Sequence, residues 1–293
     1  MHKENIIVWL FKKFIQFVGV FSEEKSNKIM YKIHTGKKLN LKKPKLFNEK
    51  LMKLKIDDYN NNELVSKCAD KYKMQEYVKE CGLEQVLNPI YKVYSNADEI
   101  DFNELPNKFV LKCNHGCGYN IICTNKETLN IKKTKKLLNK WLKIKFGKGT
   151  RELHYLKIKP LIICEKYIET NEGILPNDYK IYCFNGEPKL LLTCTGREEE
   201  LKLNFYDFDW NELMLGHEKN RAKNAIKKPE CLIEMVEYAR VLAKPFKFVR
   251  VDFYDLDGKP VLGELTFTPA RCSAAYYNDE GSKKLGEMLK IED

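Results

Sequence analysis

The sequence lacks a secretory signal, an internal repeat, a low-complexity tract and an apolar run long enough to cross a bilayer. Its most apolar stretch, residues 6–21, is interrupted by Lys12 and Lys13 and is shorter than the about 20 residues that a membrane-spanning helix needs. Its ten cysteines are mostly scattered singly, which favours a reduced, cytosolic protein over a disulfide-bonded secreted domain. With 43% hydrophobic residues in 293, the chain is globular and long enough for two lobes.

Positive charge is concentrated near the N-terminus. Residues 1–60 hold 14 Lys/Arg and 6 Asp/Glu, a balance of +8, whereas the rest of the chain holds 38 and 35, a balance of +3. This distribution argues against nucleic-acid binding and for a docking segment. As a helix, residues 6–21 would set a polar stripe against a broad apolar face, which suits peripheral contact with the inner face of the plasma membrane. Packing on the protein itself or on a second subunit is the alternative.

The periodicities predict an α+β fold. Apolar residues at helical spacing over residues 63–82 predict a helix that stops at Gly82, and strands outnumber helices in the second half of the chain. Asn185-Gly186 predicts a tight hairpin. We expect a basic helical extension over 1–60, a first lobe over 61–165 and a second lobe over 166–293.

Charged residues alternate with apolar ones in "FVRVDFYDLDGKPVLGELTFTP", residues 248–269. Arg250 and Asp252 would share one face of a strand, and Glu264 and Thr266 one face of the next. Two converging carboxylates suit Mg²⁺, but a surface salt bridge to Arg250 is the alternative. A two-residue turn at Asp257-Gly258 would leave Glu264 on the wrong face, so a metal site requires a longer turn or a bulge.

The stretch "VLKCNHGCGYNI" combines Lys112 with a loop containing Gly116 and Gly118, the components of a phosphate cradle. His115 in this loop could contact phosphate or substrate, or be an ordinary hydrogen-bonded loop residue. A zinc site is a rival interpretation, although C-x-H-x-C matches no usual zinc spacing. Its ligands would be Cys113, His115, Cys117 and Cys123.

The order of these motifs resembles that of ATP-grasp ligases. Asp70-Lys71, the lysine and glycine loop, "EKYI" at residues 165–168, "RVDF" at 250–253 and "ELTFTP" at 264–269 follow one another as in that superfamily. Residues 38 to about 290, with "FNEKL", "LKCNHG", "DYKIYCFNGEPK" and "NFYDFDW", further resemble the TupA-like ATP-grasp proteins. The resemblance implies the ATP-grasp fold, in which two α/β lobes clasp ATP.

The resemblance also implies site residues. Lys71 and Lys112 would bind the phosphates of ATP, with the loop of Gly116 and Gly118 covering them. Glu165, Lys166, Tyr167 and Ile168 would flank adenine, with backbone contacts from Lys166 and Ile168. Asp178 would approach the ribose or the phosphates. Mg²⁺ would lie on Asp252, Glu264 and Thr266, and the catalytic cations would be Arg250, Lys180 and Lys112.

The activity implied is ATP-dependent formation of an amide from a carboxylate and an amine through an acyl phosphate. The resemblance points to an amino acid and a uronic acid or similar group of a bacterial surface polysaccharide. The alternatives are a phosphotransferase acting on a sugar or lipid and a non-catalytic ATP-binding relative. Two departures from the superfamily bear on this choice: Thr266 replaces a common asparagine, and "PARCSAAYY" at 269–277 lacks the glycines expected there.

Overall fold

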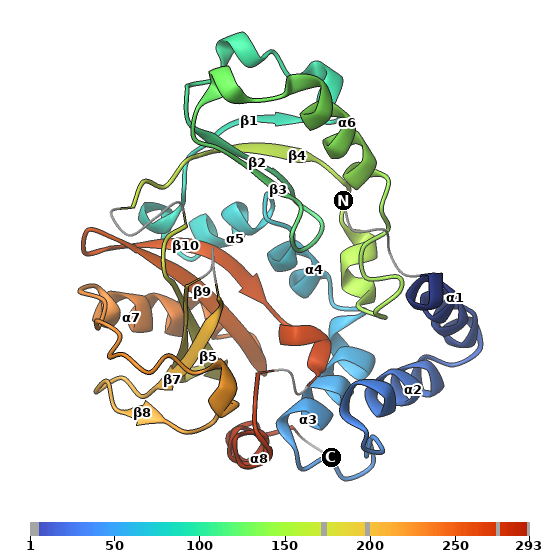
Figure 1. Ribbon diagram of the computed structural model, residues 1–293. Helices are drawn as coiled ribbons and strands as arrows, with labels where there is room; N and C mark the ends of the chain where they lie inside the picture. The colour runs from blue at the N-terminus through green and yellow to red at the C-terminus, as the bar shows by residue number, and fades with distance from the viewer. Residues whose placement is uncertain (1–5, 171–174, 197–199, 274–275, 292–293) are drawn as a thin grey trace.

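The computed structural model describes residues 6–170, 175–196, 200–273 and 276–291 (Figure 1). Two antiparallel sheets organise the chain, one with strand order β1-β4-β2-β3 and one with order β10-β9-β5-β6-β7-β8. Each sheet has its own hydrophobic core. Helices cover both sheets, so the predicted α+β class is confirmed.

The smaller sheet lies at the top of Figure 1 with helix α6 beside it. Its core contains Phe109, Leu111 and Ile162 from the sheet and Leu138 from the buried face of α6. The elements of this lobe are β1 (Ile90–Tyr94), β2 (Phe109–Cys113), β3 (Asn120–Cys123), α6 (Ile131–Leu142) and β4 (Ile162–Lys166).

The larger sheet consists of β5 (Asp178–Phe184), β6 (Glu187–Thr195), β7 (Lys202–Tyr206), β8 (Glu212–Leu213), β9 (Phe248–Leu256) and β10 (Lys259–Thr266). The turn between β5 and β6 has φ values of 51° at Asn185 and 85° at Gly186, which confirms the predicted tight hairpin. Val249, Val251 and Phe253 of β9 are fully buried, and α7 (Leu232–Ala243) packs on this part of the sheet.

The opposite face of the larger sheet is aromatic at one end of the strands and charged further along them. The ring of Phe47 packs at an angle against Tyr182, Phe184 and Phe248 near one end of β5 and β9, where α3 (Phe47–Leu54) and α8 (Asp279–Met288) meet. Further along the same face, the strands carry charged residues. The apolar half of this face therefore anchors the helices, and the charged half faces the smaller sheet.

The helix predicted over 63–82 is two helices, α4 (Glu63–Ala69) and α5 (Met74–Glu80). The break lies at Asp70, whose backbone is extended (φ −78°, ψ 111°). Its carboxylate accepts the backbone N–H groups of Tyr72 at 2.9 Å and Lys73 at 3.3 Å, so it competes with the helical hydrogen bonds. The break places Lys71 outside both helices.

Helices α1 (Ile6–Phe21) and α2 (Glu23–Thr35) lie side by side at one edge of the molecule (Figure 1). Helices α3, α4 and α5 and the π-helical turn Lys55–Tyr59 share the core of the larger sheet. Within the described ranges, no helix has both the length and the apolar character needed to cross a membrane.

Candidate functional site

The β9–β10 hairpin combines a two-residue turn with a bulge. Leu256 pairs with Lys259 across Asp257 and Gly258, which have φ values of 50° and 78°. The register then shifts between Leu262 and Glu264, so that Gly263 is the extra residue and Glu264 lies opposite Asp252. The sequence predicted that a longer turn or a bulge is needed to bring both carboxylates to one side of the hairpin, and this bulge provides it.

Glycine suits the bulge because neighbouring atoms leave little room for a side chain at position 263. A Cβ on Gly263 would lie 3.1 Å from the ring of Tyr254 and 3.3 Å from the carbonyl oxygen of Asp252. A side chain at this position would therefore have to displace Tyr254.

Arg250 and Asp252 form a buried, two-pronged ion pair. Nε of Arg250 donates to Oδ1 of Asp252 at 2.7 Å, and a terminal nitrogen donates to Oδ2 at 2.6 Å. The same guanidinium donates to Oγ1 of Thr266 at 3.2 Å, and this hydroxyl donates to Glu264 at 3.1 Å. Arg250 and Asp252 are 5% and 2% exposed, so the pair is not the surface salt bridge considered as the alternative.

Strand β5 adds a second cation beside Asp252. Lys180 is the direct neighbour of Asp252 across β5 and β9, and its Nζ lies 2.6 Å from Oδ2 of Asp252. The same Nζ lies 2.5 Å from Oδ2 of Asp178, two residues earlier on β5. Asp178, Lys180, Arg250 and Asp252 therefore share one face of the sheet because each strand alternates its side chains.

Lys71 connects the two lobes. Its Nζ donates to the carbonyl of Gly116 in the glycine loop at 2.8 Å and lies 3.4 Å from Oε2 of Glu264. The break at Asp70 makes this possible, and the backbone N–H of Lys71 also donates to the carbonyl of Asn114 at 3.2 Å. On the smaller sheet, Nζ of Lys112 lies 2.6 Å from Oε2 of Glu165, which is a neighbouring strand's residue.

These groups surround one cavity of about 310 Å³ between the sheets. A slot of about 70 Å³ at the end of β4 shares Lys112, Asn120 and Tyr254 with it. The cavity contains nine of the predicted site residues: Lys71, Lys112, Gly116, Gly118, Asp178, Lys180, Arg250, Asp252 and Glu264. The slot contains Lys112 again, with Glu165, Lys166, Tyr167 and Ile168.

Cationic and acidic residues meet in this cavity and slot. The cationic residues that line them are Lys71, Lys112, Lys166, Lys180 and Arg250, and the acidic ones are Glu165, Asp178, Asp252 and Glu264. Burial alone would raise the pKa of Glu264, but Lys71, Lys180 and Arg250 hold this pKa at about 2. Burial would lower the pKa of Lys180, yet Asp178 and Asp252 raise it above its ordinary value. Glu264 and Lys180 are therefore both charged at neutral pH.

His115 lies away from the cavity. Its side chain is 2% exposed, and Nε2 lies 3.2 Å from the carbonyl oxygen of Ile144. Its ring also packs beside Tyr119. The structure therefore supports the alternative of an ordinary loop histidine over contact with phosphate or substrate.

The zinc interpretation finds no support in the described part of the chain, where no group of three or more His, Cys, Asp or Glu residues could hold a metal ion. Cys113 and Cys123 are buried, whereas Cys117 is exposed. The donors that the fold does bring together are oxygens, namely the carboxylates of Asp252 and Glu264 with the Thr266 hydroxyl beside them. This set suits Mg²⁺, which takes one or two carboxylates together with phosphates and water.

The segment after β10 keeps a glycine-like backbone without glycine. Ala270, Arg271 and Cys272 have φ values of 48°, 59° and 58°, in the left-handed region that non-glycine residues rarely occupy. Tyr276, which follows this segment, lines the cavity. The chain therefore adopts the turn for which glycine was expected, at the cost of local strain.

Several residues that line the cavity and slot are not among the predicted site residues, and the polar ones include Asn120, Tyr254 and Tyr276. Tyr254 could have been found, because it follows Asp252 by two residues and so shares its face of β9. Asn120 begins the strand after the glycine loop, which is a weaker signal. Tyr276 had no signal, since only tertiary packing brings its segment back to the sheet.

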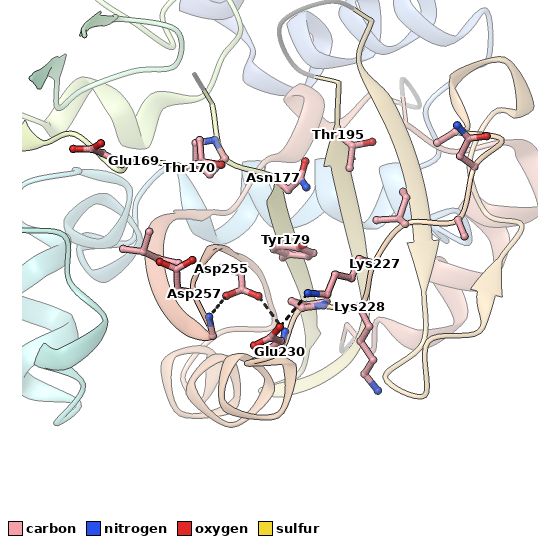
Figure 2. Close-up of a pocket in the computed structure, with 18 residues that line it drawn as sticks. Glu169, Thr170, Asn177, Tyr179, Thr195, Lys227, Lys228, Glu230, Asp255 and Asp257 are labelled. Carbon is pink, nitrogen blue, oxygen red and sulfur yellow. Dashed lines mark hydrogen bonds and ion pairs between the residues drawn. The ribbon is translucent and has the colours of Figure 1, made fainter. Parts of the chain in front are cut away.

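A larger cavity of about 530 Å³ lies on the other face of the β9–β10 hairpin (Figure 2). Tyr179 and Asp255 line it, and both alternate along their strands with the residues of the charged cavity. The carboxylate of Asp255 accepts the backbone N–H groups of Gly258 at 2.8 Å and Glu230 at 3.0 Å. These contacts fix the turn and the segment before α7, and none of the predicted site residues lines this larger cavity.

Comparisons with known proteins show what the chain is similar to. The chain is similar to D-alanine–D-alanine ligase from Bacillus anthracis complexed with ATP, at 16% identity over 76% of this chain and 63% of that one (TM-score 0.45). It is similar to D-cycloserine synthetase DcsG, at 15% identity over 77% and 70% (TM-score 0.41). It also resembles the ATP-grasp ligase PsnB complexed with a precursor variant, Mg and ADP, at 11% identity over 83% and 65% (TM-score 0.40).

The chain spans less than two thirds of the D-alanine–D-alanine ligases that it matches. The search of curated proteins found no match. The family description "TupA-like ATPgrasp" matches residues 49–290, which is most of the chain and includes every residue that lines the charged cavity. The protein therefore belongs to the TupA-like ATP-grasp family and has the ATP-grasp fold.

Proposed function

We propose that the protein is an ATP-dependent carboxylate–amine ligase that forms an amide through an acyl phosphate. One observation carries the proposal: Lys71, Lys112, Lys180 and Arg250 converge with the opposed carboxylates of Asp252 and Glu264 on one cavity between two lobes. Cations in such number suit a triphosphate, and paired carboxylates suit the metal that accompanies it.

Asp252 and Glu264 would hold Mg²⁺, with the hydroxyl of Thr266 as a weaker auxiliary oxygen. Bound there, the ion would neutralise charge on the phosphates of ATP. Arg250 and Lys180 both pair with Asp252, and Lys71 lies near Glu264. If a triphosphate bound, these three cationic side chains could pair with its phosphates. Asp252 and Glu264 would then be available to bind the metal.

Lys71 and Lys112 would bind phosphates from the two sides of the cavity. The slot at the end of β4 would take adenine, because Val110 and Ile122 give it apolar walls next to the backbone of Lys166 and Ile168. The carbonyl of Lys166 accepts a hydrogen bond from Asn88 at 2.9 Å, which holds this backbone in place and leaves a second lone pair. Asp178 would lie toward the ribose or the phosphates.

The reaction requires no nucleophilic side chain. A substrate carboxylate oxygen forms a bond to the γ-phosphorus while the bond to the β-phosphate oxygen breaks, giving an acyl phosphate and ADP. An amine nitrogen then bonds to the acyl carbon, and inorganic phosphate and a proton leave. Arg250 and Lys180 would stabilise the charge on the transferring phosphoryl group, and the cavity would align the reactants.

For the substrates, we propose an amino acid and a uronic acid or related group used in bacterial surface polysaccharide synthesis in the cytoplasm. Membership of the TupA-like family supports this choice. The ten free cysteines support a reducing compartment.

The test is a screen for ADP release with the full chain, ATP and Mg²⁺, in which amino acids are combined with uronic acids. We expect ADP release that needs both a carboxylate and an amine, with equal amounts of ADP and inorganic phosphate. A phosphorylated product without inorganic phosphate would identify a phosphotransferase instead. Binding of ATP with no turnover across the screen would identify a non-catalytic relative.

A further inference from the structure

Helix α1 presents an apolar stripe to solvent. Leu10, Phe14, Phe17 and Phe21 are spaced by four, three and four residues, so they lie on one face of the helix. They are 54%, 51%, 64% and 75% exposed, and Val20 beside them is 79% exposed. Within the described residues, nothing covers this stripe.

The opposite side of α1 is fixed to the protein. Ile15 is fully buried, and a Cβ on Gly19 would lie 2.5 Å from the guanidinium carbon of Arg151. Arg151 donates to the carbonyl of Gly19 at 3.3 Å and, through Nε, to the carboxylate of Glu23 at 3.0 Å. Packing on the rest of the protein therefore buries only the inner side of α1. Because that side is fixed, the apolar stripe faces outward.

The part of the chain that contains and follows this stripe is rich in lysine. Residues 12–45 contain ten lysines and two acidic residues, Glu23 and Glu24. Glu23 pairs with Arg151 and Glu24 with Lys28, so both carboxylates are already matched by cations. Lys13 on α1 and Lys25 and Lys32 on α2 are exposed.

We propose that the outward face of α1 docks the protein on the surface of an anionic lipid bilayer. The helix would lie in the plane of the surface, with Phe14 and Phe17 at the boundary between headgroups and acyl chains and the lysines against anionic headgroups. This role goes beyond the ligase activity and would bring the protein to the bilayer surface.

Charge favours a lipid surface over a second copy of the chain. A symmetric contact through α1 would bring two segments with a balance of +8 each against one another. Like charges at such a contact repel, whereas an anionic bilayer complements them. The aromatic stripe and the basic flanks therefore fit the same occupant.

The experiment is flotation of the full-length chain with vesicles of phosphatidylcholine alone or mixed with phosphatidylglycerol, without ATP or acceptors. We expect binding to the anionic vesicles that weakens in high salt and falls by about tenfold or more on neutral vesicles. The double variant Phe14→Gln/Phe17→Gln should lose about tenfold or more of this binding, and Lys13→Glu/Lys25→Glu should lose a similar factor.

The matched control is Met214→Gln/Ile233→Gln, which removes apolar side chains of similar exposure, 59% and 76%, from elsewhere on the surface. It should bind vesicles like the unaltered protein. All six side chains are exposed, so circular dichroism should show unchanged folding in every variant.

Absence of binding by the unaltered protein, or equal binding by Phe14→Gln/Phe17→Gln, would overturn the proposal. A dimer in sedimentation velocity that this variant abolishes, with no vesicle binding, would identify a second copy as the occupant and also overturn it. Because nucleotide is absent, vesicle binding and ligase activity can fail independently of one another.

Discussion

Asp252 lies directly opposite Glu264 across β9 and β10, although the two-residue turn between the strands would pair Asp252 with Gly263. The single extra residue in β10 brings Glu264 to the charged cavity and the hydroxyl of Thr266 to Arg250 and Glu264. The proposed metal site thus depends on one backbone irregularity as much as on the two carboxylates.

We expect Asp252→Asn and Glu264→Gln each to lower the rate of ADP release by about 10²-fold or more, because each removes a carboxylate of the proposed metal site. The control is Asp255→Asn on the same strand, whose side chain faces the other cavity and binds the backbone of Glu230 and Gly258. This variant should lose some thermal stability but keep its turnover. Substrate-dependent turnover at the unaltered rate in both cavity variants would contradict the proposed site.

Lys112→Met should lower kcat/KM for ATP by about 10²-fold, since it removes a cation from the proposed phosphate site. It should also lower the melting temperature, because Glu165 is 7% exposed and would lose its ion pair. The double variant Lys112→Met/Glu165→Gln should regain stability but not activity.

The comparison is Lys108→Met, which breaks the exposed pair with Glu169. We expect its kinetics to match those of the unaltered protein. If recovery of stability in the double variant also restored kcat/KM, Lys112 would be a structural residue only.

The pKa of Glu264 is lowered from 4.5 to about 2 in the folded protein. Because the folded-state pKa is the lower one, the ionised carboxylate stabilises the protein fully above pH 4.5, and this contribution disappears as the pH falls toward 2. We expect the difference in free energy of unfolding between the unaltered protein and Glu264→Gln to shrink across that window. Urea unfolding at a series of pH values measures it, and a constant difference would contradict the ionic environment described.

Gly263→Ala should raise the KM for ATP several-fold, because the new methyl group must displace Tyr254, which borders both the cavity and the slot. Gly258→Ala on the same hairpin is the control. It meets no atom closer than 3.5 Å, but its φ of 78° strains alanine. We expect Gly258→Ala to destabilise the protein by about 1 kcal/mol without changing the KM. Equal KM effects in the two variants would show that hairpin stability, not the position of Tyr254, is responsible.

The sequence predicted those site residues whose positions follow from strand alternation and short-range turn preferences. Alternation along β9 places Arg250 and Asp252 on one face because side chains in a strand repeat every two residues. The glycine loop with Lys112 follows from short-range turn preferences. Recognising the family added Lys71, Asp178 and Lys180, whose residue types alone carry no distinctive pattern.

Tertiary contacts decided the rest. The bulge at Gly263 was a condition that the sequence could state but not verify, because the register depends on the packing of Tyr254 and the neighbouring strands. The helix break at Asp70 was hidden by continuous apolar spacing and arises from side-chain hydrogen bonds to Tyr72, Lys73 and Asn114. His115 had the sequence context of a ligand, but its ring turns to the carbonyl of Ile144.

Arg151 and Glu152 are neighbours in sequence whose side chains bind different parts of the chain. Arg151 binds Gly19 and Glu23 of the first two helices, while Glu152 accepts the hydroxyl of Thr268 at 2.6 Å, two residues beyond Thr266. A shortened version of the protein starting after Thr35 would strip the partners from a guanidinium that is 7% exposed in the intact chain. Such a truncation would disturb Arg151, whose neighbour Glu152 supports the segment after β10 through Thr268. Measurements on the truncated protein would therefore not represent the intact chain.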